Sequence, residues 1–187
     1  MEQLQFLQQI RTQRGDSLWE LSHIRPVLVV FLRHFGCVFC KEAMSELGKL
    51  KAKIESQHTQ LVLVHLADDE TAEAFFSQYG LSDVDYISDP EAKVYQQFGL
   101  LKGELSQMVG MRVWLRTFQQ GVIKGHGLST HLIGDGFQMP GVFLLYEGVI
   151  KEKFIHHTIA DKPDYLKLAV CSDYQRGSGK EGLNYRD

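Results

Sequence analysis

Two cysteines separated by two residues, Cys37 and Cys40, are the side chains of this sequence with the clearest chemistry. They follow an apolar stretch at residues 27–32 and precede a segment with helical periodicity that runs to residue 56. A Cys-x-x-Cys pair between a strand and a helix is typical of thiol–disulfide redox proteins. The spacing and setting of the pair therefore predict a redox site.

The predicted helix gives the two cysteines different environments. Cys37 lies at its N-terminus, where unpaired backbone N–H groups and the helix dipole favour the thiolate, which is the nucleophilic form. Cys40 lies one turn further on, on the apolar face with Met44. We therefore expect Cys37 to attack an electrophile, forming a sulfenic acid or a mixed disulfide. Cys40 is expected to resolve this product to an internal disulfide.

Two basic residues precede the pair. Arg33 stays protonated at any working pH and is expected to stabilise the Cys37 thiolate, whereas His34 would do so only while charged. Because side chains alternate along a strand, one of the two could instead point to solvent. Arg33 is predicted to be catalytic with the two cysteines, and His34 to support the site.

A metal site is the main alternative use of the cysteine pair. A structural zinc site needs a second pair of ligands, but the third and last cysteine, Cys171, stands alone. His126 and His131 lie in a glycine-dense segment without a third ligand. The sequence therefore predicts neither a metal nor another cofactor, and Cys171 is expected to be a buried thiol on the last helix.

A second class of function is a redox-responsive module that binds a protein partner with little turnover. Phe35 and Phe39 flank the first cysteine and could form an exposed docking surface, with core packing as the alternative for at least one of them. A turnover assay would distinguish this module from an oxidoreductase.

The composition is that of a globular protein. The chain has 187 residues, of which 44% are hydrophobic and 23% charged. We expect one domain over residues 1–172 and a polar, flexible tail over residues 173–187. The net charge of −3 and the lack of a basic block argue against nucleic-acid binding.

Nothing in the sequence points to a membrane or to secretion. No apolar run approaches the ~20 residues of a membrane span, and residues 1–10 are too rich in Gln and Glu for a signal peptide. The sequence therefore predicts a cytoplasmic protein. Structural disulfides are rare in that compartment, so a close cysteine pair is better explained by reversible chemistry than by a permanent crosslink.

The hydrophobic periodicity predicts alternating strands and helices. Strands are expected at residues 27–32, 60–65 and 86–88, and a β-hairpin at 142–156. Helices are expected at residues 1–13, 18–22, 37–56, 68–79, 91–98 and 164–170, with a helical insertion at 102–121 before the hairpin. This order predicts an α/β fold with a mixed central sheet flanked by helices.

Three segments, residues 31–42, 88–100 and 134–144, resemble the peroxiredoxin-like proteins of the alkyl hydroperoxide reductase and thiol-specific antioxidant (AhpC/TSA) group, which have the thioredoxin superfold. The resemblance spans about residues 25–170. It implies a thioredoxin-like domain, a peroxide or a disulfide as substrate, and an external thiol reductant of thioredoxin or glutathione type. It leaves the oligomeric state open, with a homodimer as one alternative.

The resemblance also assigns supporting residues. Pro140 corresponds to the proline that faces the cysteine pair across the active site, usually in the cis form, and Gly36 directly precedes Cys37. Typical members carry a proline and a threonine or serine seven and three residues before the peroxide-reacting cysteine, where the hydroxyl orients the peroxide. Counted from Cys37, this sequence has Val30 and His34 there. The thiol–disulfide part of the chemistry needs only the cysteine pair.

Overall fold

A computed structural model of the chain describes residues 5–32, 35, 38–100, 139–157 and 161–181. Within these ranges the elements follow in the order η1 (Gln5–Gln8), α1 (Leu18–Ile24), β1 (Val27–Phe31), α2 (Val38–Ser56), β2 (Gln60–His65), α3 (Asp69–Gln78), β3 (Asp85–Ser88), α4 (Lys93–Gln97), β4 (Gly141–Tyr146), β5 (Val149–Ile155), α6 (Tyr165–Leu168) and α7 (Ser172–Glu181). The described strands form a five-stranded sheet in the order β3-β2-β1-β4-β5. The predicted α/β fold with a mixed sheet is confirmed.

Strand β1 is the centre of the sheet. It pairs in parallel with β2 and antiparallel with β4, so that Val29 lies opposite Val62 on one side and Phe143 on the other. The parallel pairing follows from the crossover through α2, which returns the chain to the same end of the sheet. Strands β4 and β5 instead form the predicted hairpin, whose turn residues Glu147 and Gly148 both have positive φ, as the tightest hairpin turns require.

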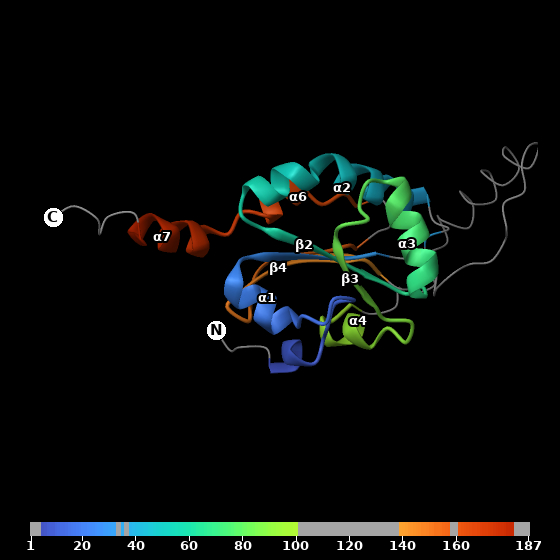
Figure 1. The fold of residues 1–187 in the computed structure, drawn as a ribbon, viewed down its shortest axis with the longest axis horizontal. Coiled ribbons are helices and arrows are strands. Elements are labelled where there is room, and N and C mark those ends of the chain that lie inside the picture. The colour runs from blue at the N-terminus through green and yellow to red at the C-terminus, as the bar shows by residue number, and fades with distance from the viewer. Residues whose placement is uncertain (1–4, 33–34, 36–37, 101–138, 158–160, 182–187) are drawn as a thin grey trace, which may run out of the picture.

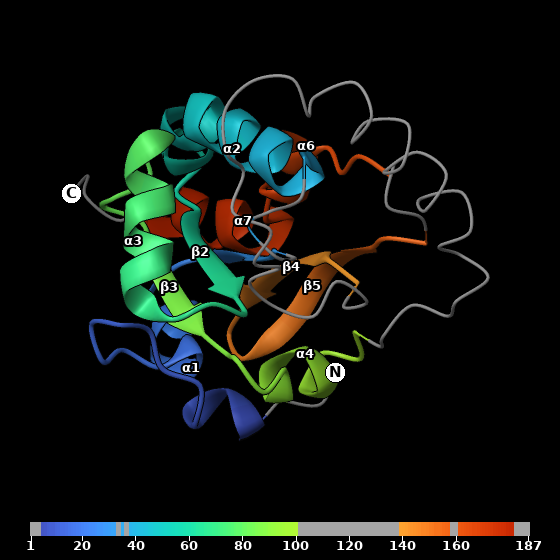
Figure 2. The same ribbon diagram turned by 90° about the vertical axis from the view of Figure 1, so that its right-hand side faces the viewer.

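Helices cover both faces of the sheet. Figures 1 and 2 show α2, α3 and α6 on one face and α1 and α4 on the other. All five β1 residues are buried, and they alternate between two cores. Leu28 and Val30 pack beneath α2, whereas Val27, Val29 and Phe31 pack beneath α1. Burial on both faces explains why β1 is an unbroken apolar run.

The helix predicted at residues 1–13 is wrong for residues 9–13, and residues 1–4 lie outside the described part of the chain. Within residues 5–13 the helical part is the short 3-10 helix η1, after which the chain extends so that Arg11 bridges to Ser17. The main-chain N–H of Gln13 donates to the oxygen of Tyr86 at 3.0 Å. The tertiary contact with β3 thus replaces the intrahelical hydrogen bonds that the local pattern favoured.

Two further predictions concern the last third of the chain. The helical insertion at residues 102–121, with His126 and His131 after it, lies outside the described residues. Helix α7 occupies the start of the segment predicted as a polar tail, and its Asp173 pairs with Lys151 of β5 at 2.9 Å. The division into a domain and a tail stays a prediction. In the described ranges, no helix has the length and apolar character needed to cross a membrane.

Candidate active site

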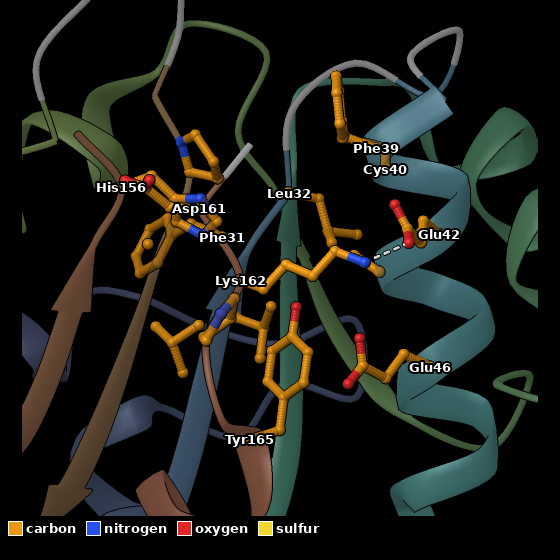
Figure 3. A pocket seen from close by; sticks show the side chains of 16 residues that line it. Phe31, Leu32, Phe39, Cys40, Glu42, Glu46, His156, Asp161, Lys162 and Tyr165 are labelled. Carbon is orange, nitrogen blue, oxygen red and sulfur yellow. Dashed lines mark hydrogen bonds and ion pairs between the residues drawn. The ribbon is translucent and has the colours of Figure 1, made fainter. Parts of the chain in front are cut away.

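The end of β1 and the start of α2 enclose a cavity of about 60 Å³ together with two segments from the C-terminal part of the chain (Figure 3). One of these segments is the start of β4, and the other lies between β5 and α6. The walls are mainly apolar, and a few polar side chains reach into the space. The volume accommodates a small polar molecule or the reactive end of a larger one.

Cys40 lies in the first turn of α2 and lines this cavity. Its side chain is only 4% exposed, so a reagent reaches the sulfur through the cavity. The first turn of a helix carries unpaired N–H groups and the positive end of the helix dipole, both of which favour a thiolate. The geometry therefore gives Cys40 a setting suited to thiol chemistry.

The fold brings two of the predicted site residues together. Cys40 from α2 and Pro140, which precedes β4, both line the cavity although they are far apart in the sequence. The remaining site residues lie outside the described part of the chain, and their roles stay predictions. They are Arg33, His34, Gly36 and Cys37.

Pro140 differs from the expectation in one respect. The described residues contain no cis peptide bond, so the bond between Met139 and Pro140 is trans. The cis form that the resemblance implied is therefore corrected, and trans is the more stable isomer of most X–Pro bonds. The oxygen of Pro140 accepts a hydrogen bond from the main-chain N–H of His156 at 3.4 Å, which ties it to the end of the hairpin.

A buried tyrosine of α4 supports the segment that precedes the cysteine pair. The hydroxyl of Tyr95 donates to the main-chain oxygens of Leu32 and, at 3.0 Å, of Val64. Asp89 orients the start of α4 by accepting a hydrogen bond from the main-chain N–H of Tyr95 at 3.2 Å. Burial raises the pKa of Tyr95 well above its usual value, and negative charge on Cys40 acts in the same direction. The hydroxyl therefore stays protonated and remains a donor.

An ion pair connects the segment before α6 to α2. The Nζ atom of Lys162 contacts the carboxylate of Glu42 (Figure 3), and this hydrogen bond raises the pKa of Lys162. Both side chains are exposed, so the pair adds little stability. The sequence analysis missed both residues because they lie 120 positions apart and belong to no motif or periodic pattern.

Tyr165 is another cavity residue that the sequence analysis missed. It is the first residue of α6, it is 4% exposed, and it belongs to the core cluster beneath α2. Burial raises the pKa of its hydroxyl, and the charges of Glu46 and Cys40 act in the same direction. Tyr165 therefore presents an uncharged hydroxyl to the cavity at neutral pH.

The two phenylalanines beside the cysteine pair have different environments. Phe35 is 1% exposed, and its ring stacks on Phe75 with centroids 4.8 Å apart. Core packing, the alternative to an exposed docking surface, is thus confirmed for Phe35. Phe39 is half-buried and lines the cavity. A docking surface at the pair would have to rely on Phe39.

Cys171 is buried as predicted, but it lies between α6 and α7 and not on a helix. Burial raises the pKa of its thiol, which disfavours the reactive thiolate. Within the described ranges, no three His, Cys, Asp or Glu side chains form a group that could hold a metal ion. Cys171 therefore serves as an internal control for the reactivity of the other thiols.

The sequence was compared with family models and with known proteins. Residues 8–152 match the model of the AhpC/TSA family. The chain is 27% identical over 170 residues to the prostamide/prostaglandin F synthase of Salmo salar, which covers 87% of this chain and 82% of that protein. It is 30% identical over 145 residues to peroxiredoxin-like 2C of Bos taurus, which covers 74% of this chain and 63% of that protein.

Solved structures with a thioredoxin fold are similar to this one. Peroxiredoxin Q of Xanthomonas campestris has a TM-score of 0.60 at 13% identity, covering 86% of this chain and 88% of that one. A yeast mitochondrial 1-Cys peroxiredoxin, whose thiol is resolved through glutathione/thioredoxin systems, has a TM-score of 0.58 at 14% identity, covering 95% and 78%. These likenesses confirm the predicted thioredoxin-like fold.

Proposed function

Because the chain belongs to the AhpC/TSA family, we propose that it is a thiol oxidoreductase that uses Cys37 and Cys40 to reduce a peroxide or a disulfide. The observation that carries this proposal is that Cys40, in the first turn of α2, and Pro140 line the same cavity. A thiol in the first turn of a helix with access to a small cavity is suited to the resolving step that the proposal gives to Cys40.

In the proposed reaction, the Cys37 thiolate attacks the distal oxygen of a hydroperoxide. A sulfur–oxygen bond forms, the oxygen–oxygen bond breaks, and an alcohol leaves. The Cys40 sulfur then displaces water from the sulfenic acid and forms an internal disulfide. With a disulfide substrate, the first product is a mixed disulfide that Cys40 resolves in the same way.

An external thiol must return the pair to the dithiol. The similarity to the yeast peroxiredoxin supports a reductant of the glutathione or thioredoxin type. The proposal also includes a cytoplasmic location, where such reductants keep thiols reduced. The oligomeric state, including a homodimer, is left to measurement.

The lining of the cavity favours an organic substrate over hydrogen peroxide. Side chains such as Leu32, Phe39 and Val142 provide apolar surface next to Cys40. Apolar surface contributes to binding in proportion to the area that a ligand covers, and hydrogen peroxide has no apolar part. The likeness to a prostamide/prostaglandin F synthase supports lipid-derived compounds as one arm of a substrate screen.

A second candidate function is the redox-responsive binding module with little turnover. Phe39 is the observation that favours it, because this half-buried ring lines the cavity beside Cys40. Formation of the disulfide would change the surface around this ring. The burial of Phe35 reduces the apolar surface available for such a partner.

The proposal is tested by counting the thiols that the reduced protein loses when it meets hydrogen peroxide, cumene hydroperoxide or glutathione disulfide. We expect at least one oxidant to remove two thiols, with a reductant restoring both over repeated cycles. Cys40→Ser should give a trappable product on Cys37 but no turnover, and Cys37→Ser should give neither. Cys171→Ser is the matched control and should behave as the parent.

Each failure has a distinct meaning. A parent protein that forms the disulfide but does not turn over supports the binding module. A parent that keeps all its thiols contradicts both functions. If Cys40→Ser cycles as fast as the parent, the internal disulfide mechanism is wrong.

A further inference from the structure

Carboxylates predominate among the charged side chains that line the cavity. They belong to Glu42 and Glu46 of α2 and to Asp161, which precedes α6. The basic groups that the described residues add to the lining are the ammonium of Lys162 and the imidazole of His156. Beside apolar walls, a fixed charge is screened less than in open water. The charge of a molecule therefore affects its entry.

Lys162 does not neutralise both glutamates of α2. Its Nζ atom pairs with Glu42, whereas the described residues provide no ion-pair or hydrogen-bond partner for Glu46. Glu46 is half-buried and lies one helical turn beyond Glu42, on the same face of α2. Burial is the main cause of the raised pKa of Tyr165, and the charge of Glu46 is the next. The negative charge of Glu46 is thus felt inside the cavity.

Glu46 and Cys40 act on the same part of the cavity. Figure 3 shows the Glu46 carboxylate directed from α2 toward the space in front of Tyr165, with Glu42 between Glu46 and Cys40 along the helix. Cys40 affects the same tyrosine hydroxyl as Glu46 does. Because the Cys40 side chain is only 4% exposed, a reagent reaches its sulfur through the cavity and passes through the field of these carboxylates.

We propose that Glu46 is a specificity-determining residue that keeps anionic molecules from the Cys40 sulfur and admits neutral and cationic ones. This inference rests on the proposed function and deepens it, because it restricts the substrates and external thiols that use the cavity to those whose entering end carries no negative charge. Among organic hydroperoxides, neutral compounds are thus favoured over carboxylates. The exclusion is electrostatic, so it weakens as salt screens the charges.

The test uses a Cys37→Ser, Cys171→Ser protein in which Cys40 is the one remaining thiol. Three methanethiosulfonates, carrying an aminoethyl, a hydroxyethyl or a sulfonatoethyl group, differ mainly in charge. The Cys40 thiolate attacks the sulfenyl sulfur of the reagent, a mixed disulfide forms, and methanesulfinate leaves. Each rate is divided by the rate of the same reagent with the chain unfolded in urea, which removes differences in intrinsic reactivity.

We expect the ammonium reagent to react at least about tenfold faster than the sulfonate reagent at low salt, with the hydroxyethyl reagent between them. The ratio of the two rates should shrink at about 1 M salt. A change in the thiol pKa alters all three rates equally and leaves this ratio unchanged. The ratio therefore reports the charge preference of the cavity alone.

Glu46→Gln should lower the ratio at least about threefold, and Glu46→Asp, which keeps the charge, should retain most of it. Lys162→Met should raise the ratio, because it leaves the charge of Glu42 unneutralised. Glu152→Gln in β5 is the matched control, since Glu152 is an exposed carboxylate that does not line the cavity. This control should keep the ratio of the single-thiol protein.

An unchanged ratio in Glu46→Gln would overturn the proposal. An equal loss in Glu152→Gln would do the same, since the net charge of the protein would then set the preference. Equal rates for the three reagents in the single-thiol protein, or no labelling of Cys40 by any of them, would also overturn it. Failure of the proposed function is distinguishable, because it appears as wild-type protein that keeps its thiols with every oxidant, whereas the charge preference of Cys40 is measured without turnover.

Discussion

The hydroxyl group of Tyr95 donates a hydrogen bond to the main-chain oxygen of Leu32, the residue that follows β1 on the way to the cysteine pair. A core side chain of α4 thus holds the segment that carries the predicted site. The same hydroxyl also reaches the oxygen of Val64 in the neighbouring strand. The two strands therefore share one donor at the end of the sheet where the cavity lies.

Replacement of this donor should weaken the fold. Tyr95→Phe leaves two buried main-chain oxygens without their hydroxyl donor, so we expect the free energy of unfolding to fall by about 1–3 kcal/mol. Urea denaturation measures this change. Tyr165→Phe is the matched variant, because its hydroxyl has no acceptor among the described residues, and it should lose less stability. Equal losses in the two variants would contradict this role of Tyr95.

The sequence was informative where local pattern and tertiary structure agree. The apolar run at residues 27–32 and the Glu147-Gly148 turn led to the central strand and the hairpin that the structure contains. Several residues that line the cavity could not be predicted from the sequence. Tyr165 belongs to a helix of only four residues, and Lys162 meets Glu42 through a pairing across 120 positions. No periodicity or motif records such contacts, since only the assembled fold creates them.

Gly48 in α2 should not tolerate a side chain, although alanine is the better helix former. A Cβ atom at this position would lie 2.1 Å from the main-chain oxygen of Tyr79, at the end of α3. We expect Gly48→Ala to lower the free energy of unfolding by about 1–3 kcal/mol, because the helices must move apart. This range is the net effect, after the gain of about 1 kcal/mol from helix propensity.

Gly177→Ala in α7 is the control for Gly48→Ala. A Cβ atom at Gly177 meets nothing within 4 Å, so helix propensity should dominate there. Thermal denaturation should show a neutral or slightly stabilising effect for Gly177→Ala. If Gly48→Ala is as stable as the parent, the close approach of α2 and α3 is wrong.

His65 should make the fold sensitive to mild acid. It is fully buried at the end of β2, in contact with Phe76 and Tyr86. Burial lowers its pKa to about 4, against the opposing effects of the Ala67 backbone and the Asp68 carboxylate. The unfolded chain, with a histidine pKa near ~6.5, binds the proton more readily. Stability is therefore fully present above about pH 6.5 and is lost as the pH falls toward 4.

The loss attributable to His65 amounts to roughly 3 kcal/mol over this range. It is measured as the difference in urea unfolding free energy between pH 7 and pH 4.5. His65→Leu removes the titrating group and should flatten the dependence of stability on pH relative to the parent. Parallel curves for the parent and His65→Leu would show that the ring is already protonated in the fold or that it is not buried.

Arg33 is expected to lower the pKa of Cys37 through its fixed positive charge. Arg33→Ala should raise the thiol pKa and slow oxidation. Arg33→Lys should give an intermediate rate, because it keeps the charge but loses the planar set of donors. The pH dependence of alkylation gives the thiol pKa, and the rate at high pH, where every thiol is ionised, isolates any effect on the reacting oxygen. Arg176→Ala, in exposed α7, removes the same charge elsewhere and should match the parent. If Arg33→Ala also matches the parent in pKa and rate, the start of α2 alone must activate the sulfur.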